Sequence, residues 1–127
     1  MHQFLTFAIA SPLQYAIADF MREHPEHETE LPVFYAGRRD YLRRALAASR
    51  FRLRPTPATY FQLVDYGAIA DEADTRFVQT LIERCRVAAI PLSPFSVDPV
   101  PGERLLRLCF AKEEATLAEA ARRLAAL

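Results

Sequence analysis

The spacing of hydrophobic residues changes several times along this chain of 127 residues, and this change limits the folds open to it. Four stretches repeat apolar residues every three or four positions, as amphipathic helices do. The short stretches between them are rich in β-branched and aromatic residues, as strands are. The predicted order is helix, helix, strand, strand, helix, strand, strand, helix. Such a chain is expected to form an α/β fold in which helices pack against a short sheet.

The first two helices are predicted near the N-terminus. Residues 11–14 (Ser-Pro-Leu-Gln) form a start signal, because Ser can cap a helix, Pro suits its first position and Gln completes a capping box. A second helix is predicted over residues 32–49, with the charged segment 38–44 on its solvent-exposed side. The regular α/β pattern begins only after residue 29, so residues 1–29 are predicted to be a separate helical piece.

A β-hairpin is predicted to follow the second helix. Its strands lie in residues 51–54 and 59–66, and prolines in the connection form a short, stiff turn. The remaining predicted elements are a helix that begins at Asp71 or Asp74, strands at residues 87–92 and 105–110, and a last helix that opens with a capping box at residues 116–119.

The composition excludes several classes of function. Sixteen basic and sixteen acidic residues give a net charge of zero, which offers no electrostatic footprint for nucleic acid or for an anionic membrane. The N-terminus has neither a basic region nor a long apolar run, so no signal peptide or membrane span is predicted. Cys85 and Cys109 lie in apolar stretches, which favours free thiols in a reducing compartment and a cytoplasmic location.

No metal site is predicted. His24, Glu26 and His27 are close in sequence, but Pro25 argues against a helix that would bring them to one face, so we expect a solvated turn. The three glycines are far apart and form no phosphate-binding loop. The arginine-rich segment 38–44 is expected to be an ordinary solvated helix face.

Arg107 is the residue of greatest interest, because it lies in the middle of an apolar strand. A charge in such a run needs a partner or an opening to a pocket. A structural salt bridge is one interpretation. The other is that a guanidinium on a rigid strand grips a carboxylate through two parallel hydrogen bonds.

Five segments along the chain form a recognisable set of motifs. They are His2-Gln-Phe-Leu-Thr-Phe7, Pro12-Leu-Gln14, Thr59-Tyr-Phe-Gln-Leu-Val-Asp-Tyr66, Val87-Ala-Ala-Ile-Pro-Leu-Ser93 and Leu106-Arg-Leu-Cys-Phe-Ala-Lys112. Together these segments resemble the methionine/kynurenine-type aminotransferases, which are class I/II aminotransferases of fold type I. The similarity covers essentially the whole chain in one register.

The resemblance implies a two-part organisation. Residues 30–127 would form the small C-terminal domain, an α+β-like unit with a short, largely antiparallel sheet and packed helices. Residues 1–29 would be a helical remnant of the large cofactor domain. Whole enzymes of this kind are homodimers about three times longer, and they hold pyridoxal phosphate on a lysine that lies upstream of the His-Gln-Phe motif. By the same resemblance, Arg107 binds the substrate α-carboxylate and Phe7 approaches the partner subunit's active site.

The implied reaction exchanges an amino group between an amino acid, of methionine or aromatic type, and a 2-oxo acid. The only lysine of this chain, Lys112, matches a position beyond the carboxylate-binding strand rather than the Schiff-base position. We therefore expect no catalytic or cofactor-binding residue in this chain, no covalently bound pyridoxal phosphate, and no activity of the chain alone. Self-association or pairing with a large-domain polypeptide is expected instead.

Two alternatives to an aminotransferase portion stay open at this stage. The chain could be a non-catalytic α/β domain that binds a small carboxylate or a protein partner, or it could be a truncated gene product.

Three departures from the family pattern bear on how well this sequence fits the family. Ala58 and Arg86 stand where the family has glycine, and residues 93–96 replace a loop that carries a tyrosine. After a helix, glycine commonly takes a left-handed conformation that arginine disfavours.

Overall fold

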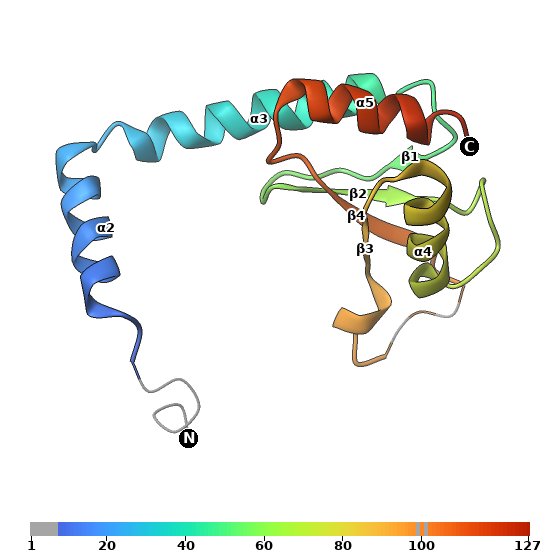
Figure 1. Ribbon diagram of the computed structural model, residues 1–127, viewed down its shortest axis with the longest axis horizontal. Coiled ribbons are helices and arrows are strands. Elements are labelled where there is room, and N and C mark those ends of the chain that lie inside the picture. The colour runs from blue at the N-terminus through green and yellow to red at the C-terminus, as the bar shows by residue number, and fades with distance from the viewer. Residues whose placement is uncertain (1–7, 99, 101) are drawn as a thin grey trace. The chain divides into compact units, whose positions relative to one another are not determined.

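The computed structural model describes residues 8–98, 100 and 102–127, and the chain divides into two compact units. The first unit ends at Phe34, and the second runs from Tyr35 to Leu127. Helix α2 (Ser11–Glu23) belongs to the first unit, and the boundary between the units falls inside helix α3 (His27–Ala45) (Figure 1). Each unit is described by itself below.

Helix α2 confirms the predicted helix, but the capping box predicted at its start is wrong. Ser11 is already helical, and Ala10 precedes the helix without a side-chain cap. The Gln14 side chain instead donates to the Ile9 carbonyl oxygen at 3.1 Å. No residue of α2 is buried, so its apolar stripe is exposed.

Helix α3 starts at His27, earlier than the predicted start at Pro32, and it contains this proline. Proline lacks only its own N–H, and its position near the start of the helix keeps the loss to one helical hydrogen bond. The turn before α3 is exposed, as predicted for residues 24–27. In the part of the chain that the structure describes, no helix is long and apolar enough to cross a membrane.

The second unit is built on a four-stranded sheet in the order β1-β2-β4-β3. Every neighbouring pair is antiparallel, which confirms the expected sheet. Strand β4 lies between β2 and β3 (Figure 1). The strands are β1 (Arg52–Leu53), β2 (Phe61–Asp65), β3 (Ile90–Pro91) and β4 (Leu105–Cys109), and a short 3-10 helix, η1 (Ser93–Phe95), follows β3.

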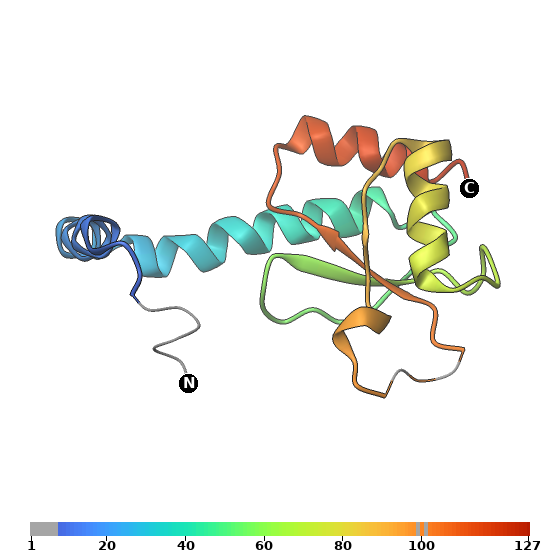
Figure 2. The ribbon, with the colours of Figure 1, turned by 60° about the horizontal axis from the view of Figure 1, so that its bottom comes forward.

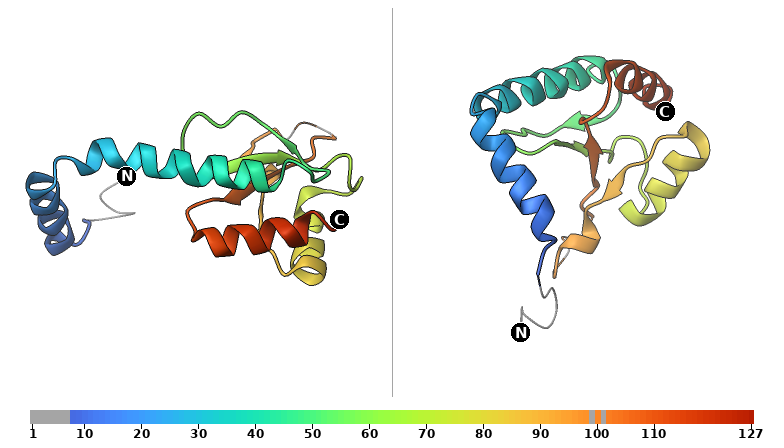
Figure 3. Two further views of the ribbon diagram at one scale, coloured as in Figure 1. Left: turned by 90° about the horizontal axis from the view of Figure 1, so that it is seen from above. Right: turned by 60° about the vertical axis from the view of Figure 1, so that its left-hand side comes forward.

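One face of this sheet carries the hydrophobic core. Side chains alternate between the two faces of a strand, and the even-numbered residues of β2 and β4 are buried, together with Leu105 at the start of β4. The C-terminal part of α3, helix α4 (Asp74–Cys85) and helix α5 (Glu114–Leu124) cover this face (Figure 2, Figure 3). The core residues that are least exposed and largest are Tyr66, Phe77, Phe110, Leu46, Leu81, Leu106 and Leu124.

The charged segment of α3 differs from its prediction as a solvated face. Arg38 lies 3.3 Å from Glu114 of α5, and its side chain is only 16% exposed. Arg39 and Arg43 each donate to a main-chain oxygen of the hairpin, and Arg43 also donates to Gln62 at 3.1 Å. These long side chains therefore tie α3 to the sheet and to α5, which a simple apolar periodicity does not reveal.

The later boundaries also differ in detail from the sequence prediction. Helix α4 begins at Asp74, one of the two predicted starts. Helix α5 begins at Glu114, so Thr116 lies inside the helix and the capping box predicted there is wrong. The strand predicted over residues 87–92 is reduced to the two residues of β3.

Arg86, directly after α4, adopts the left-handed conformation expected from the family pattern, with φ 56° and ψ 34°. The chain then turns, and the Val87 N–H donates to the Leu81 carbonyl oxygen at 3.3 Å. The other left-handed non-glycine residue in the described ranges is Thr59, next to Ala58. Both substitutions of a family glycine thus lie at or beside a strained backbone position.

Replacing Arg86 with glycine should stabilise the chain by about 1 kcal/mol, because a left-handed conformation costs most L-residues about 1–2 kcal/mol and glycine almost nothing. Urea unfolding followed by circular dichroism measures this gain. Arg84→Gly, in the last turn of α4, is the matched control and should destabilise the chain. A variant Arg86→Gly that is less stable than the parent chain would contradict the strain argument.

Candidate carboxylate site

Arg107 lies in the middle of β4, on the sheet face opposite the core. Its neighbours Leu106 and Leu108 are buried on the helix side, so its own side chain extends to the other side. Across the sheet it pairs with Leu63 of β2 and Ile90 of β3. Strands on both sides therefore fix the backbone from which this guanidinium extends.

Two aromatic rings enclose the guanidinium. Its Cζ atom lies 4.7 Å from the ring centroid of Phe61, on β2, and 4.3 Å from that of Phe95, in η1. Both distances are within the range of cation–π attraction. Phe61 pairs with Cys109, two residues from Arg107, so the two side chains lie on the same face.

No acidic side chain in the described part of the chain forms an ion pair with Arg107. Its Nε atom is buried and has no hydrogen-bond partner among the described residues. A buried N–H donor without an acceptor lowers the stability of the fold by about 1–3 kcal/mol. A ligand that accepts a hydrogen bond from this atom would remove that penalty. Within the described residues, the structural salt bridge considered from the sequence is therefore wrong.

Asp74, the first residue of α4, organises the segment that carries Phe95. Its Oδ2 atom accepts hydrogen bonds from the main-chain N–H groups of Leu92 at 2.8 Å and Ser93 at 2.7 Å. Its Oδ1 atom accepts from the Ser93 hydroxyl at 2.7 Å and from the Thr75 N–H at 2.8 Å. Burial by itself would raise the pKa of Asp74, but these hydrogen bonds outweigh it and hold the pKa below its usual range.

The sequence predicted Asp74 only as a possible helix start. The signal that could be read was an acidic residue before an apolar helical repeat. Its second role depends on a segment eighteen residues further along the chain, and spacing along a sequence does not reveal such a contact.

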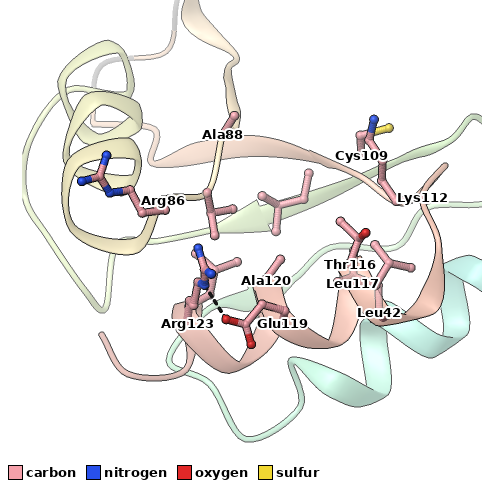
Figure 4. Close-up of a pocket in the computed structure, with 14 residues that line it drawn as sticks. Leu42, Arg86, Ala88, Cys109, Lys112, Thr116, Leu117, Glu119, Ala120 and Arg123 are labelled. Carbon is pink, nitrogen blue, oxygen red and sulfur yellow. Dashed lines mark hydrogen bonds and ion pairs between the residues drawn. The ribbon is translucent and has the colours of Figure 1, made fainter.

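A pocket of about 590 Å³ opens against α5 (Figure 4). Its lining combines apolar residues such as Leu108 and Leu117 with the charged residues Arg86, Lys112 and Glu119. Glu119 forms a 2.7 Å ion pair with Arg123 in the same lining. Hydrogen bonds from Arg122 and Arg123 lower the pKa of Glu119 to about 2, so this carboxylate stays charged.

The other residues considered from the sequence do not join a site in the described ranges. His24 contacts Glu26 at 3.2 Å, and the ring of Phe20 packs against both His24 and His27. No group of three or more metal-ligating residues is brought together in the part that the structure describes. Cys85 and Cys109 are free thiols. Phe7 lies outside the described residues.

Comparison with known proteins identifies the family. A family model described as aminotransferase class I and II matches residues 1–124. A methionine aminotransferase of Escherichia coli is 51% identical over 124 residues, which are 98% of this chain and 32% of that protein. A kynurenine–oxoglutarate transaminase of the mouse is 26% identical over 92% of this chain and 32% of its own length.

Solved structures agree with the sequence comparison. The structure of YbdL from Escherichia coli, reported with a methionine aminotransferase function, is 51% identical with a TM-score of 0.88 and covers 99% of this chain and 33% of its own. The N-succinyldiaminopimelate aminotransferase from Mycobacterium tuberculosis is 31% identical with a TM-score of 0.85 over 98% of this chain and 32% of its own. The chain belongs to the class I and II aminotransferases, and it spans about a third of the length of the relatives it matches.

Aminotransferases of this family use pyridoxal phosphate, and the described residues do not by themselves fit a site for it. The cofactor needs a lysine amine close to the bound substrate. Lys112, the only lysine, lines the pocket against α5. Arg107 lies instead between Phe61 and Phe95, on the face of the sheet away from the helices. The chain thus holds the Arg107 guanidinium and the Lys112 amine in separate places.

Proposed function

We propose that this chain supplies the small, carboxylate-binding domain of an aminotransferase, with Arg107 as the group that binds the α-carboxylate. The observation that carries the proposal is a guanidinium held between two rings without an acidic partner among the described residues. A carboxylate can accept two parallel hydrogen bonds from such a planar group. The rings restrict the guanidinium plane, which lowers the entropy lost on binding.

The proposed reaction is exchange of an amino group between an amino acid of methionine or aromatic type and a 2-oxo acid. The support is the similarity to a methionine aminotransferase at 51% identity and to a kynurenine transaminase at 26% identity. On this proposal residues 1–29 belong to the large cofactor domain and residues 30–127 form the small domain. Phe7 is proposed to approach the active site of the partner subunit in a homodimer.

The chain alone is proposed to be inactive, because Lys112 and Arg107 cannot act on one substrate from separate places. The two free thiols support a reducing compartment, and a cytoplasmic location stays a prediction. The separation of these two groups also favours a second candidate, a non-catalytic domain that binds a small carboxylate through Arg107. The two candidates differ in whether a large-domain polypeptide restores transamination.

Arg107→Lys should weaken carboxylate binding by about tenfold to a hundredfold, because one charge-assisted contact contributes about 1.5–3 kcal/mol and a point charge cannot form the paired contact. Nuclear magnetic resonance titration with the 2-oxo acid of methionine measures the affinity. Arg52→Lys, on the exposed edge strand β1, is the control and should leave the affinity unchanged. Equal affinities for all three chains would refute the role of Arg107.

Adding pyridoxal phosphate to the chain should produce no stoichiometric visible band from a specific internal aldimine. The reason is that Lys112 matches a position beyond the carboxylate-binding strand rather than the Schiff-base position of the family. Absorption spectra at increasing cofactor concentration measure this, with Lys112→Ala as the control. A saturable band of one equivalent that disappears in Lys112→Ala would show that the prediction is wrong.

The apolar face of α2 should drive self-association or pairing with a large-domain polypeptide. Leu13, Ile17 and Phe20 recur at helical spacing and are 62%, 60% and 44% exposed. Apolar surface that is exposed to water is unfavourable by about 25 cal/mol per Å², so burying this face in an interface lowers the free energy. Sedimentation of the purified chain should therefore show concentration-dependent association, which Ile17→Glu weakens. Tyr15→Glu, on the opposite side of α2, is the matched control. A chain that stays monomeric at high micromolar concentration would contradict this expectation.

A further inference from the structure

The short helix η1 depends on one side chain for its hydrogen-bonded attachment to the rest of the domain. Strand pairing ends at Pro91, before η1 begins. Outside the sheet ladder and among the described residues, the hydrogen bonds that leave residues 92–98 go to the Asp74 carboxylate. The others, from the N–H groups of Phe95 and Ser96, stay within the segment.

The Asp74 carboxylate is well suited to this attachment. The residue is 6% exposed, and four donors surround its two oxygens at 2.7–2.8 Å. Only a charged carboxylate offers enough acceptor sites for four donors at once. Three of these donors belong to Leu92 and Ser93, so the carboxylate fixes the direction in which η1 leaves β3.

Phe95 has little else to hold it in place. Its side chain is 66% exposed, and it is not part of the hydrophobic core. Its ring nevertheless lies 4.3 Å from the Arg107 guanidinium. Ser93, which bonds to Asp74 through both its N–H and its hydroxyl group, is two residues before Phe95 in the same 3-10 turn. The ring position therefore follows from the anchored backbone of η1.

We propose that Asp74 is a positioning residue for Arg107: its buried carboxylate anchors η1 and thereby holds Phe95 over the guanidinium. The hydrogen bonds of Asp74 are with Thr75, Leu92 and Ser93 rather than with Arg107, so it acts through the backbone of η1. Phe61 is held by the ladder between β2 and β4, whereas Phe95 belongs to η1, which lies outside the sheet. When the anchor is lost, Phe95 leaves and water reaches the buried Nε of Arg107. The part of this proposal that concerns an anion rests on the proposed function, whereas the geometric part does not.

The geometric part is tested by nuclear magnetic resonance of the chain without any ligand. A ring stacked on Arg107 shifts the resonances of its δ protons upfield, and Phe95→Leu gives the value without this ring. In Asp74→Asn, whose amide has one acceptor oxygen instead of two, these resonances should move most of the way to the Phe95→Leu value. Asp71→Asn, at a 95% exposed carboxylate before the same helix, should leave them unchanged.

Core signals of Phe77 and Leu81 report whether Asp74→Asn remains folded. If it unfolds, Ser93→Ala replaces it, because this variant removes only the hydroxyl contact and should shift the Arg107 resonances part of the way. Unchanged Arg107 resonances in the folded variant would overturn the proposal. Movement towards the Phe95→Leu value supports it.

Titration with the 2-oxo acid of methionine is the second arm. Affinity should fall about threefold to tenfold in Asp74→Asn, since the enclosing ring contributes roughly the energy of one cation–π contact. A parent chain that binds no carboxylate would refute the proposed function, while the ligand-free resonances would still decide whether Asp74 positions Phe95. A third outcome is that the parent chain and Asp74→Asn bind the 2-oxo acid equally well although the Arg107 resonances of the variant are displaced. That result would refute a role of Asp74 in binding.

Discussion

The antiparallel pairing of β2 with β4 is the constraint on which the rest of the second unit depends. Five residue pairs, from Phe61 with Cys109 to Asp65 with Leu105, fix which side chains lie on each face. Shifting this register by one residue would turn Leu106 and Leu108 away from the core and would bury Arg107 beneath the helices. The same ladder therefore stabilises the core on one face and presents a cation on the other.

The exposed chemistry of the sheet follows from this separation of faces. On the side away from the helices, Arg107 has aromatic neighbours and no acidic partner in the described residues. On the helix side, charged groups such as Glu119 and Arg123 are paired with each other. The proposed function assigns anion binding to Arg107 because the motion of this cation is restricted, whereas paired surface charges contribute little to stability.

Much of this arrangement could be predicted from the sequence, because the periodicity of apolar residues reports which side of an element is buried. The order of elements, the antiparallel sheet, the strand that carries Arg107 and the strained position of Arg86 all follow from local patterns or from family motifs. The two capping boxes failed because the helices begin at other residues, Ser11 and Glu114. The arginines of α3 and the role of Asp74 were missed, since each depends on a partner that only the folded chain brings near.

The ladder between β2 and β4 also has a consequence for how the chain folds. The residues that it pairs are 40 to 48 positions apart, as in Asp65 with Leu105 and Phe61 with Cys109. Closing so long a loop lowers the entropy of the chain before the favourable strand contacts have formed. Proteins rich in such distant contacts therefore fold slowly. Helices α4 and α5 consist of local contacts and can form early. The walls around Arg107 come from β2, β4 and η1, so the cation acquires its surroundings only when this long loop has closed.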